Sequence, residues 1–389
     1  MLHRQSWVLV LCVSITLSFS LSVLWRLQSR VSQPKIASGA GKRVVRDPQH
    51  PCRTVAHIRN PIPEAPVMGV EQCRGLGQNW SAGTLPARQD QGWILRQLKL
   101  VQSCPWVHNA SALGQYREQL GGCCNASADL VLTHNNTRLG SQIVYDGRPA
   151  QKYLVKEELL EILPQGSPFQ AAPYECCAVV GGGGILRDSG CGPEIDRAQF
   201  IIRINPPWGW PPEDFADDVG TRSNVVTMNP SVLRNRFGGL GRRRRPFVAV
   251  VGAYGATLLL VPAFSFPGNI QVSFQALYTL QDFDSPARTV FMNPEYLARL
   301  DGHWHRRGLR ANRLSSGFML VSAALEMCRH LTLYGFWPFP SNPEGRPLPH
   351  HYYDNQPPKR GVHAMPEEFT RYLGMHLQGA LRLHLGWCW

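Results

Sequence analysis

Short apolar runs alternate with longer segments of helical apolar spacing from about residue 175 to the carboxyl end of the chain. Runs of about four to eight apolar residues bounded by turn residues are typical of buried strands, and the longer spacing is typical of amphipathic helices. Strands are predicted at 177–181, 200–205, 225–229, 247–251, 257–264, 289–293 and 331–336. Helices are predicted around 294–308, 316–330 and 366–383. This alternation predicts the α/β fold class, with a mostly parallel sheet flanked by helices.

Four consecutive glycines, Gly181 to Gly184, follow the first predicted strand. Such a turn lets the backbone approach a bound group closely; a tight turn without a ligand is the alternative. Ligands of open parallel sheets bind at the carboxyl ends of strands, where Asn205 and the stretch 334–339 also fall. Residues 315–317 open a predicted helix, whose free N–H groups would suit a phosphate. The sequence thus predicts an anion-binding site at this edge of the sheet.

The glycine turn does not match the common nucleotide-binding motifs. Leu186 stands where a dinucleotide motif needs its last glycine, and no G-K-[ST] of a P-loop occurs. Asp282 and Asp284 flank an aromatic residue, as in the D-x-D that holds a divalent metal in many sugar-nucleotide transferases, but such a triplet also commonly ends a helix. The arginine run 242–245 is interpreted as a solvated loop before the strand predicted at 247–251.

The amino-terminal pattern differs from the rest. Residues 7–25 carry no charge and would span about 28 Å as a helix, which predicts an uncleaved transmembrane signal anchor. A cleavable signal peptide is the alternative. The preceding residues 1–6 would form a cytosolic tail. Residues 26–90, rich in Gly, Pro, Gln and Arg, would form a flexible stem ahead of a single folded domain at 91–389.

Glycosylation signals and cysteines indicate the compartment. Four N-x-S/T sequons and eleven cysteines fit a secretory lumen, where glycans are added and disulfides persist. Cys12 lies in the anchor, so ten cysteines remain, enough for five bridges. Their spacing does not match zinc sites. The chain is therefore expected to be a type II membrane protein with a luminal body, glycosylated at Asn79, Asn109, Asn125 and Asn135.

Composition and net charge restrict the fold and the function less than the motifs do. The chain has 389 residues, of which 43% are hydrophobic, and this suffices for a large folded core. Its net charge of +13 points toward acidic partners, but charge alone does not choose among nucleic acid, an anionic membrane, nucleotides and acidic sugars.

Four motifs, in order, resemble those of the animal sialyltransferases. Residues 176–231 resemble the large sialyl motif, 314–339 the small motif, 350–354 (HHYYD) the third motif and 363–369 (HAMPEEF) the very short motif. The wording SGCG, TMNPS, YGFWPF and HYYD is similar to the alpha-2,8-sialyltransferase branch. Within it, NNT, LLVPAFSF and HHYYDN look most like the fifth and sixth vertebrate members. The segment before the large motif is mixed in charge rather than strongly basic, which favours mono- or oligosialylation.

This resemblance implies a fold and an activity. The fold would be the sialyltransferase variant of a GT-A-like, Rossmann-type architecture. The enzyme would transfer sialic acid from CMP-sialic acid to the 8-hydroxyl of a terminal sialic acid on a glycolipid or glycoprotein, with inversion and without a metal or other cofactor. The enzyme would be a Golgi membrane protein that binds no nucleic acid. A homodimer is possible.

The resemblance also implies roles for single residues. His363 matches the family's general base, and histidine is the side chain whose ordinary pKa lies nearest neutrality. His351 matches the residue that meets the departing phosphate oxygen. The residues that match donor-binding positions are Gly181, Gly182, Gly183, Asn205, Ser315, Ser316, Gly317, Gly335, Phe336 and Trp337; the aromatic ones could instead belong to the core.

The resemblance also implies two disulfides, and the chain departs from the family pattern at one position of the glycine turn. Disulfides are expected for Cys177 with Cys328 and for Cys191 with Cys388, whereas Cys52, Cys73, Cys104, Cys123, Cys124 and Cys176 cannot be paired from the sequence. The family usually has asparagine where this chain has Gly182, a substitution that removes a side-chain hydrogen bond to the donor. A weakly active or inactive sialoglycan-binding relative is therefore the alternative function, and a metal-dependent transferase using Asp282 and Asp284 is a third.

Overall fold

The computed structural model describes residues 52, 73, 91–210, 212–356 and 363–388 of the chain. The expected tail and anchor, and all of the expected stem except Cys52 and Cys73, lie outside the described residues. Within the described ranges, no helix combines the length and the apolar character needed to cross a membrane.

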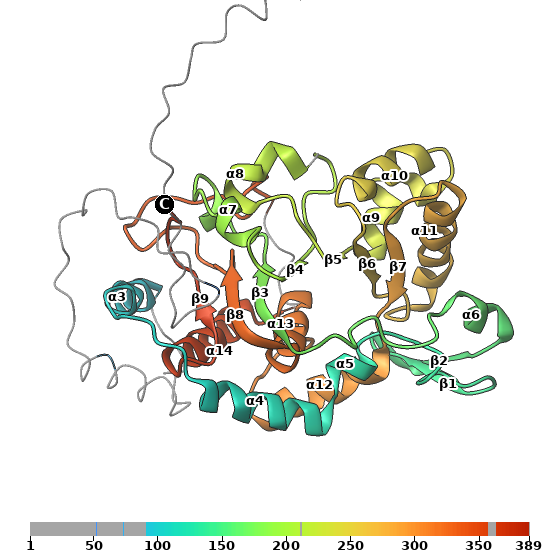
Figure 1. The fold of residues 1–389 in the computed structure, drawn as a ribbon, viewed down its shortest axis with the longest axis horizontal. Helices are drawn as coiled ribbons and strands as arrows, with labels where there is room; N and C mark the ends of the chain where they lie inside the picture. The colour runs from blue at the N-terminus through green and yellow to red at the C-terminus, as the bar shows by residue number, and fades with distance from the viewer. Residues whose placement is uncertain (1–51, 53–72, 74–90, 211, 357–362, 389) are drawn as a thin grey trace, which may run out of the picture. The chain divides into compact units, whose positions relative to one another are not determined.

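Seven strands form one sheet in which each neighbouring pair is parallel. Their order is β7-β6-β5-β4-β3-β8-β9, and Figure 1 shows them at the centre of the fold. The strands are β3 (Tyr174–Val180), β4 (Phe200–Arg203), β5 (Val225–Thr227), β6 (Leu258–Val261), β7 (Arg288–Phe291), β8 (Cys328–Tyr334) and β9 (Arg382–Leu383). The predicted α/β class with a mostly parallel, helix-flanked sheet is confirmed.

Both faces of the sheet are buried. In β3, Cys177 and Val179 enter one hydrophobic core, while Ala178 and Val180 enter another. Because successive strand residues point to opposite faces, these cores lie on opposite sides of the sheet. A strand covered on both faces reads as a continuous apolar run rather than an alternating one, which explains the pattern of the sequence.

Each face has its own helices. The core that contains Cys177 is closed by α3 (Gln91–Gln102), α4 (Ala110–Cys123), α5 (Ala126–Asp129), α12 (Pro294–Arg306), α13 (Ser316–Met327) and α14 (Met365–Leu377). The opposite face is covered by α6 (Glu157–Ile162), α7 (Gly192–Ile195), α8 (Ala216–Val219), α9 (Pro230–Asn235), α10 (Arg244–Gly252) and α11 (Ile270–Asp282). Short 3-10 turns lie at Gly184–Leu186, Pro212–Phe215, Gly238–Leu240 and Pro267–Asn269.

The strand predicted at 247–251 is wrong. These residues form most of α10, in which Phe247 and Val251 are buried while Ala249 between them is exposed. Burial four residues apart is the signature of a helix, and a short apolar run cannot distinguish the two structures. The arginine run before it is consequently not only a loop, because Arg244 begins α10 and forms an ion pair with Asp282 at the end of α11.

Two predicted helices end early, and one hairpin was not predicted. The helix expected to reach residue 330 stops at Met327, because Cys328 already pairs with Tyr174 in the sheet. The helix expected to reach 383 stops at Leu377, shortly before Gly379, whose φ of +77° suits a helix end. The unpredicted hairpin joins the antiparallel strands β1 (Gln142–Tyr145) and β2 (Arg148–Leu154).

Five disulfides link the described residues. Cys177–Cys328 and Cys191–Cys388 are present, as the family resemblance implies. The pairs that the sequence could not assign are Cys52–Cys176, Cys73–Cys104 and the adjacent Cys123–Cys124. Of the sequons, Asn109, Asn125 and Asn135 are exposed, as attachment of a glycan requires, while Asn79 lies outside the described residues.

The chain order of the sheet changes direction beside β3. From β3 the strands run outward on one side through β4, β5, β6 and β7, and the chain then returns to place β8 against the other side of β3. Such a switch point opens a crevice between the loops that leave the two strands, and open α/β sheets bind their ligands there. The fold therefore directs attention to the loops after β3 and β8.

Glu326 gives the fold a testable pH dependence. Burial within α13 raises the pKa of its carboxyl to about 7, although the Ala126 amide donates to Oε2 at 2.8 Å and opposes this shift. A carboxyl whose pKa is raised by folding contributes stability that is complete below its unfolded pKa and is lost as pH rises through the folded value. We therefore expect Glu326→Gln to flatten the fall in stability between about pH 5 and 7, measured by denaturant midpoints. An unchanged slope would contradict this assignment, and Glu295→Gln, on an exposed side chain, is the control.

Candidate active site

The four-glycine turn packs against the loop after β8. The Gly181 amide donates to the Tyr334 carbonyl at 2.8 Å, and the Gly183 amide donates to the Gly335 carbonyl at 2.9 Å. A Cβ atom at Gly181 or Gly183 would lie 2.8 or 2.5 Å from the Gly335 oxygen, and one at Gly184 would overlap the Pro349 carbonyl. The expected close approach is real, but the group that approaches these three glycines is protein backbone.

Gly182 is different from its neighbours. A Cβ atom there would lie 3.2 Å from Cδ2 of His351 and 3.8 Å from the Tyr353 ring, and its φ is not in the left-handed region. Asparagine at this position would therefore gain nothing from its tolerance of left-handed backbone. Any side chain would instead require the His351 ring to move by a few tenths of an ångström.

His351 is held through both its ring and its backbone, and its amide donates to the Asp354 carbonyl at 3.0 Å. Its Nδ1 lies 2.7 Å from Oδ1 of Asp354, its ring stacks on Tyr353 with centroids 4.9 Å apart, and its backbone forms a bridge with Gly183. Because an ionised carboxylate only accepts, Nδ1 carries the proton in this pair. The other ring nitrogen, Nε2, is thereby left for a substrate.

Asn205 lies close to the same group. It follows β4 with φ of +44°, its amide donates to Thr227 Oγ1 at 2.8 Å, and Thr227 Oγ1 donates to Asn205 Oδ1 at 3.1 Å. The Tyr353 hydroxyl donates to its carbonyl at 3.5 Å. Thr227 therefore fixes the side-chain amide, and within the described part of the chain the Nδ2 hydrogens have no acceptor and can serve as donors.

Ser315 is not free to meet a ligand. Its amide donates to Oε1 of the buried Glu368 at 2.7 Å, its hydroxyl donates to the other oxygen, and Oγ accepts from Phe318 at 3.0 Å. The expectation that Ser315 offers an unoccupied N–H is wrong, because a carboxylate of the protein takes that place. Within the described residues, the amides of Ser316 and Gly317 have no hydrogen-bond partner, so the first turn of α13 retains two donors.

Phe336 and Trp337, which follow β8, divide their roles. The Trp337 side chain is buried, with its ring 5.1 Å from Phe339 and 5.7 Å from Phe369, and it belongs to the core. Phe336 packs edge-on against Tyr372, and its ring lies 3.0 Å from the position of a Cβ atom at Gly317. Phe336 therefore joins the loop after β8 to the start of α13.

His363 is exposed immediately before α14. Its Nδ1 lies 3.0 Å from the backbone carbonyl of Arg313. A carbonyl oxygen can only accept, so this contact places the proton of the neutral ring on Nδ1 and leaves the Nε2 lone pair basic. The contact thus selects the tautomer that a general base needs.

The contacts link the predicted site residues into one group. Gly182 lies against His351, Gly183 against Gly335, and Gly317 against Phe336, while Ser315 leads through Glu368 to the segment that carries His363. Sequence reasoning missed Arg313, Tyr353, Asp354 and Glu368. Three of these lie inside or beside the quoted HHYYD and HAMPEEF motifs, but only coordinates show which atoms they hold.

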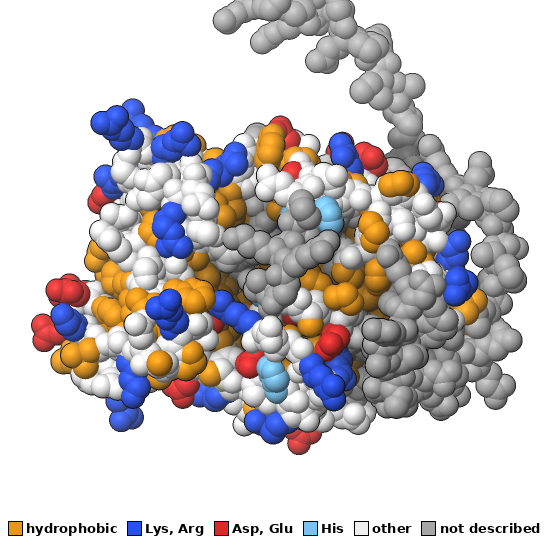
Figure 2. All heavy atoms as spheres, turned by 180° about the vertical axis from the view of Figure 1, so that it is seen from behind, with side chains coloured by type: hydrophobic (Ala, Val, Ile, Leu, Met, Phe, Trp, Pro, Cys, Tyr) orange, Lys and Arg blue, Asp and Glu red, His pale blue; other side chains and the backbone are white. Residues whose placement is uncertain are grey.

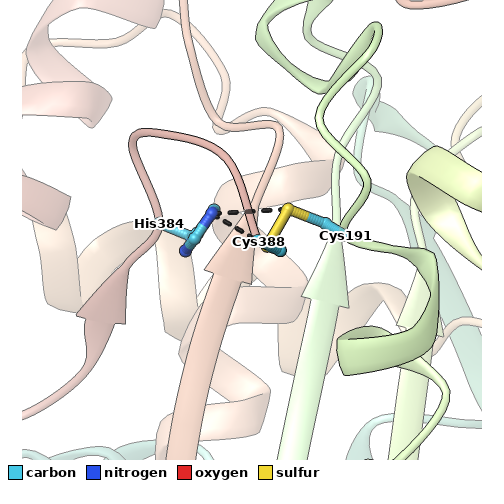
Figure 3. Close-up of side chains that lie close together, drawn as sticks. All are labelled: Cys191, His384 and Cys388. Atoms are coloured by element: carbon cyan, nitrogen blue, oxygen red, sulfur yellow. Dashed lines mark hydrogen bonds between the residues drawn. A yellow bond between two sulfur atoms is a disulfide. The ribbon is translucent and has the colours of Figure 1, made fainter. Parts of the chain in front are cut away.

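The candidate metal residues do not join this group. Asp282 ends α11 and pairs with Arg244, which agrees with the helix-end interpretation of the triplet. Figure 3 shows a second grouping, in which Nε2 of His384 lies 3.4 Å from Cys191 Sγ and 3.0 Å from Cys388 Sγ. The two sulfurs form a disulfide and so are not thiolates, and Nε2 donates to the Gly386 carbonyl at 2.9 Å, so these atoms do not provide the ligands of a metal site.

Positive charge is dispersed on the face drawn in Figure 2. Lys and Arg side chains form several separate groups there, with Asp and Glu between some of them. A net charge of +13 is therefore not gathered on this face into the continuous stripe that typifies nucleic-acid binding.

A family model described as glycosyltransferase family 29 (sialyltransferase) matches residues 131–380. The chain belongs to this family. Human alpha-2,8-sialyltransferase 8E is 42% identical over 299 residues, which cover 77% of this chain and 79% of that protein. Human alpha-2,8-sialyltransferase 8F is 34% identical over 394 residues, covering 98% of both. These relatives confirm the resemblance inferred from the motifs.

A solved structure of a family member is more distant from this chain. A crystal structure of a mammalian sialyltransferase shares 17% identity with this family member and covers 82% of the chain and 87% of its own, with a TM-score of 0.40.

The glycine packing predicts unequal tolerance within the turn. Gly184→Ala places a methyl group on the Pro349 carbonyl and should cost roughly 1–3 kcal/mol, as overpacking typically does. Gly182→Ala meets only the edge of the His351 ring and should cost less than about 1 kcal/mol. Denaturant midpoints of both variants measure the difference. Equal losses would show that the turn can relax away from its neighbours.

Proposed function

We propose that this protein is an alpha-2,8-sialyltransferase. It transfers sialic acid from CMP-sialic acid to the 8-hydroxyl of a terminal sialic acid on a glycolipid or glycoprotein glycan, adding one or a few residues with inversion and without a metal. Family membership and the names of the human relatives support this proposal. The observation that carries it is the contact between His363 Nδ1 and the Arg313 carbonyl, which leaves Nε2 as a base.

The reaction needs a base that removes the proton of the acceptor hydroxyl and a group that stabilises the negative charge on the departing phosphate oxygen. Nε2 of His363 removes the proton of the acceptor hydroxyl as its oxygen attacks the anomeric carbon of the donor. The bond from that carbon to the phosphate oxygen breaks, and CMP leaves with the electron pair. His351, held by Asp354 through Nδ1, donates from Nε2 to the departing oxygen in its imidazolium form, in which both ring nitrogens carry protons.

Donor binding follows from the remaining unoccupied groups. The two amides at the start of α13 form a small anion site of the kind that helix N-termini provide, and the phosphate of CMP-sialic acid suits it. Asn205 adds side-chain donors at the end of β4. The backbone of Gly182, which supports His351, takes part through position rather than through a side chain.

The cellular setting is part of the proposal. Five disulfides between described residues fit an oxidising compartment, and the charge-free segment 7–25 fits a signal anchor. We place the protein in the Golgi membrane as a single-pass type II protein, with residues 91–389 in the lumen and glycans on the exposed sequons.

His363→Ala tests the base. The detergent-solubilised full-length variant should lose about 10² to 10⁴ in transfer rate, because that is the usual contribution of a general base, while its affinity for CMP changes little. His305→Ala is the matched control, since among the described residues the ring of this exposed histidine makes its polar contacts with the carbonyl and carboxylate of Asp301 on the same helix. Near-normal transfer by the His363 variant would exclude the assignment.

Chelation separates the candidate functions. We expect transfer from labelled CMP-sialic acid to a sialylated acceptor to be unchanged by EDTA, because the carboxylates of the D-x-D triplet lie apart from the site and one is paired with arginine. Loss of transfer that added divalent metal restores would favour the metal-dependent alternative. Binding of the acceptor without transfer would favour the sialoglycan-binding alternative that the Gly182 substitution raises.

A further inference from the structure

A cavity of about 750 Å³ lies outside the group of motif residues described above. Its walls come from residues 132–149, which include β1 and the hairpin turn, from the first turns of α12, and from residues 312–319. The volume falls within the roughly 300–1,000 Å³ of typical small-ligand sites. Nothing in the proposed reaction so far uses this space.

Arg313 and Asp146 are the central polar groups of its lining. The Arg313 guanidinium donates to Asp146 Oδ2 at 2.5 Å and to Ser265 Oγ at 2.9 Å. The Asp146 side chain is only 8% exposed, and its other oxygen, Oδ1, has no hydrogen-bond partner in the described part of the chain. The same is true of Asp301 Oδ1, which also belongs to the lining.

An unpaired buried carboxylate oxygen is costly and calls for an explanation. Leaving such an acceptor unsatisfied typically costs about 1–3 kcal/mol, and more for a charged group. Small adjustments that expose Asp146 Oδ1 and Asp301 Oδ1 to hydroxyl donors of a ligand would recover that free energy. Two such acceptors in residues that line one cavity therefore point to a ligand with several hydroxyl groups.

Arg313 connects the cavity to the proposed base. Its side chain belongs to the cavity wall, while its backbone carbonyl accepts from Nδ1 of His363. A ligand that contacts the Arg313 side chain is thus separated from the segment that carries the base by Arg313 alone. This proximity is what an acceptor site requires, because the attacking hydroxyl has to meet His363 Nε2.

The charge balance of the lining selects the kind of sugar. Three carboxylates, Asp146, Glu295 and Asp301, and two guanidinium groups, Arg138 and Arg313, belong to the lining. Asp146 is paired with Arg313 and Glu295 with Arg299, so the charges nearly balance and offer little net attraction to an anionic sugar. Neutral sugar hydroxyls suit the carboxylates and the amide side chains of the wall, while Tyr145 and Met319 offer apolar surface to a pyranose ring.

We propose that this cavity binds the uncharged sugar that precedes the terminal sialic acid of the acceptor. The sialic acid itself would project toward His363, with its 8-hydroxyl at Nε2. This inference rests on the proposed sialyltransferase function and adds to it a recognition site for the penultimate residue, with Asp146 and Arg313 as its positioning residues.

Filling the cavity tests this inference. Ala298 is exposed on α12 and lines the cavity, so Ala298→Trp fills the space without disturbing the core. We expect the KM for a sialyl-galactose acceptor to rise at least tenfold, while hydrolysis of CMP-sialic acid by water and the KM for the donor stay within about twofold. Ala249→Trp, at an exposed alanine of α10, is the matched control and should change neither.

Asp146→Asn provides a second variant of nearly unchanged shape. Its KM should rise about fivefold for sialyl-galactose and remain unchanged for a simple methyl glycoside of sialic acid, which lacks the neutral sugar. Equal effects on both acceptors, or no effect of either variant, would overturn the inference. Because Asn135 is both a sequon and a lining residue, N-glycans are removed enzymatically from the folded protein beforehand.

A binding measurement keeps the two proposals apart. Saturation-transfer NMR with sialyl-galactose reports which sugar protons contact the protein, whether or not transfer occurs. We expect contacts to the galactose ring in the unmodified protein and their loss in Ala298→Trp. Galactose contacts without any transfer would contradict the proposed function alone, whereas transfer without galactose contacts would contradict the cavity assignment alone.

Discussion

The close approach of two backbone segments at the switch point of the sheet is the constraint on which the site depends. Gly181 and Gly183 hydrogen-bond to the carbonyls of Tyr334 and Gly335, and no side chain fits between the loops. This contact extends the pairing of β3 with β8 past the ends of both strands. The His351 segment packs against these loops through its backbone bridge with Gly183, so a change in these glycines alters the position of a proposed proton donor.

Much of the fold could be predicted because its strands are buried on both faces. The strands at Val179 and Leu260 contain runs with no polar interruption, which leave few alternatives. The same simplicity made 247–251 misleading, since a run of that length fits a helix equally well and only the packing of Phe247 and Val251 decides. The hairpin at β1 and β2 could not be predicted, because most residues of β2 are exposed and give no clear period.

The sequence predicted which residues belong to the candidate site, but not which atoms of these residues contact one another. The motifs brought His351, His363 and the glycine turn to attention, and the structure links them through shared neighbours. It did not follow from the sequence that Glu368 would occupy the amide of Ser315, or that the Trp337 ring would lie in the core. Such outcomes depend on which side chain lies within hydrogen-bonding or packing distance of a given group, and this is decided by the three-dimensional packing.

The disulfide pattern has a consequence for biosynthesis. Cys191 and Cys388 are 197 residues apart, so at about 5–20 residues per second the Cys191 thiol waits roughly 10–40 s for its partner to be synthesised. Cys177 waits for Cys328 in the same way, directly beside Cys176, whose partner Cys52 is already present. Pairing strictly in order of appearance would join Cys52 to Cys73 before Cys176 or Cys177 has been synthesised. The observed pairs therefore require that such early bonds be avoided or undone by thiol–disulfide exchange.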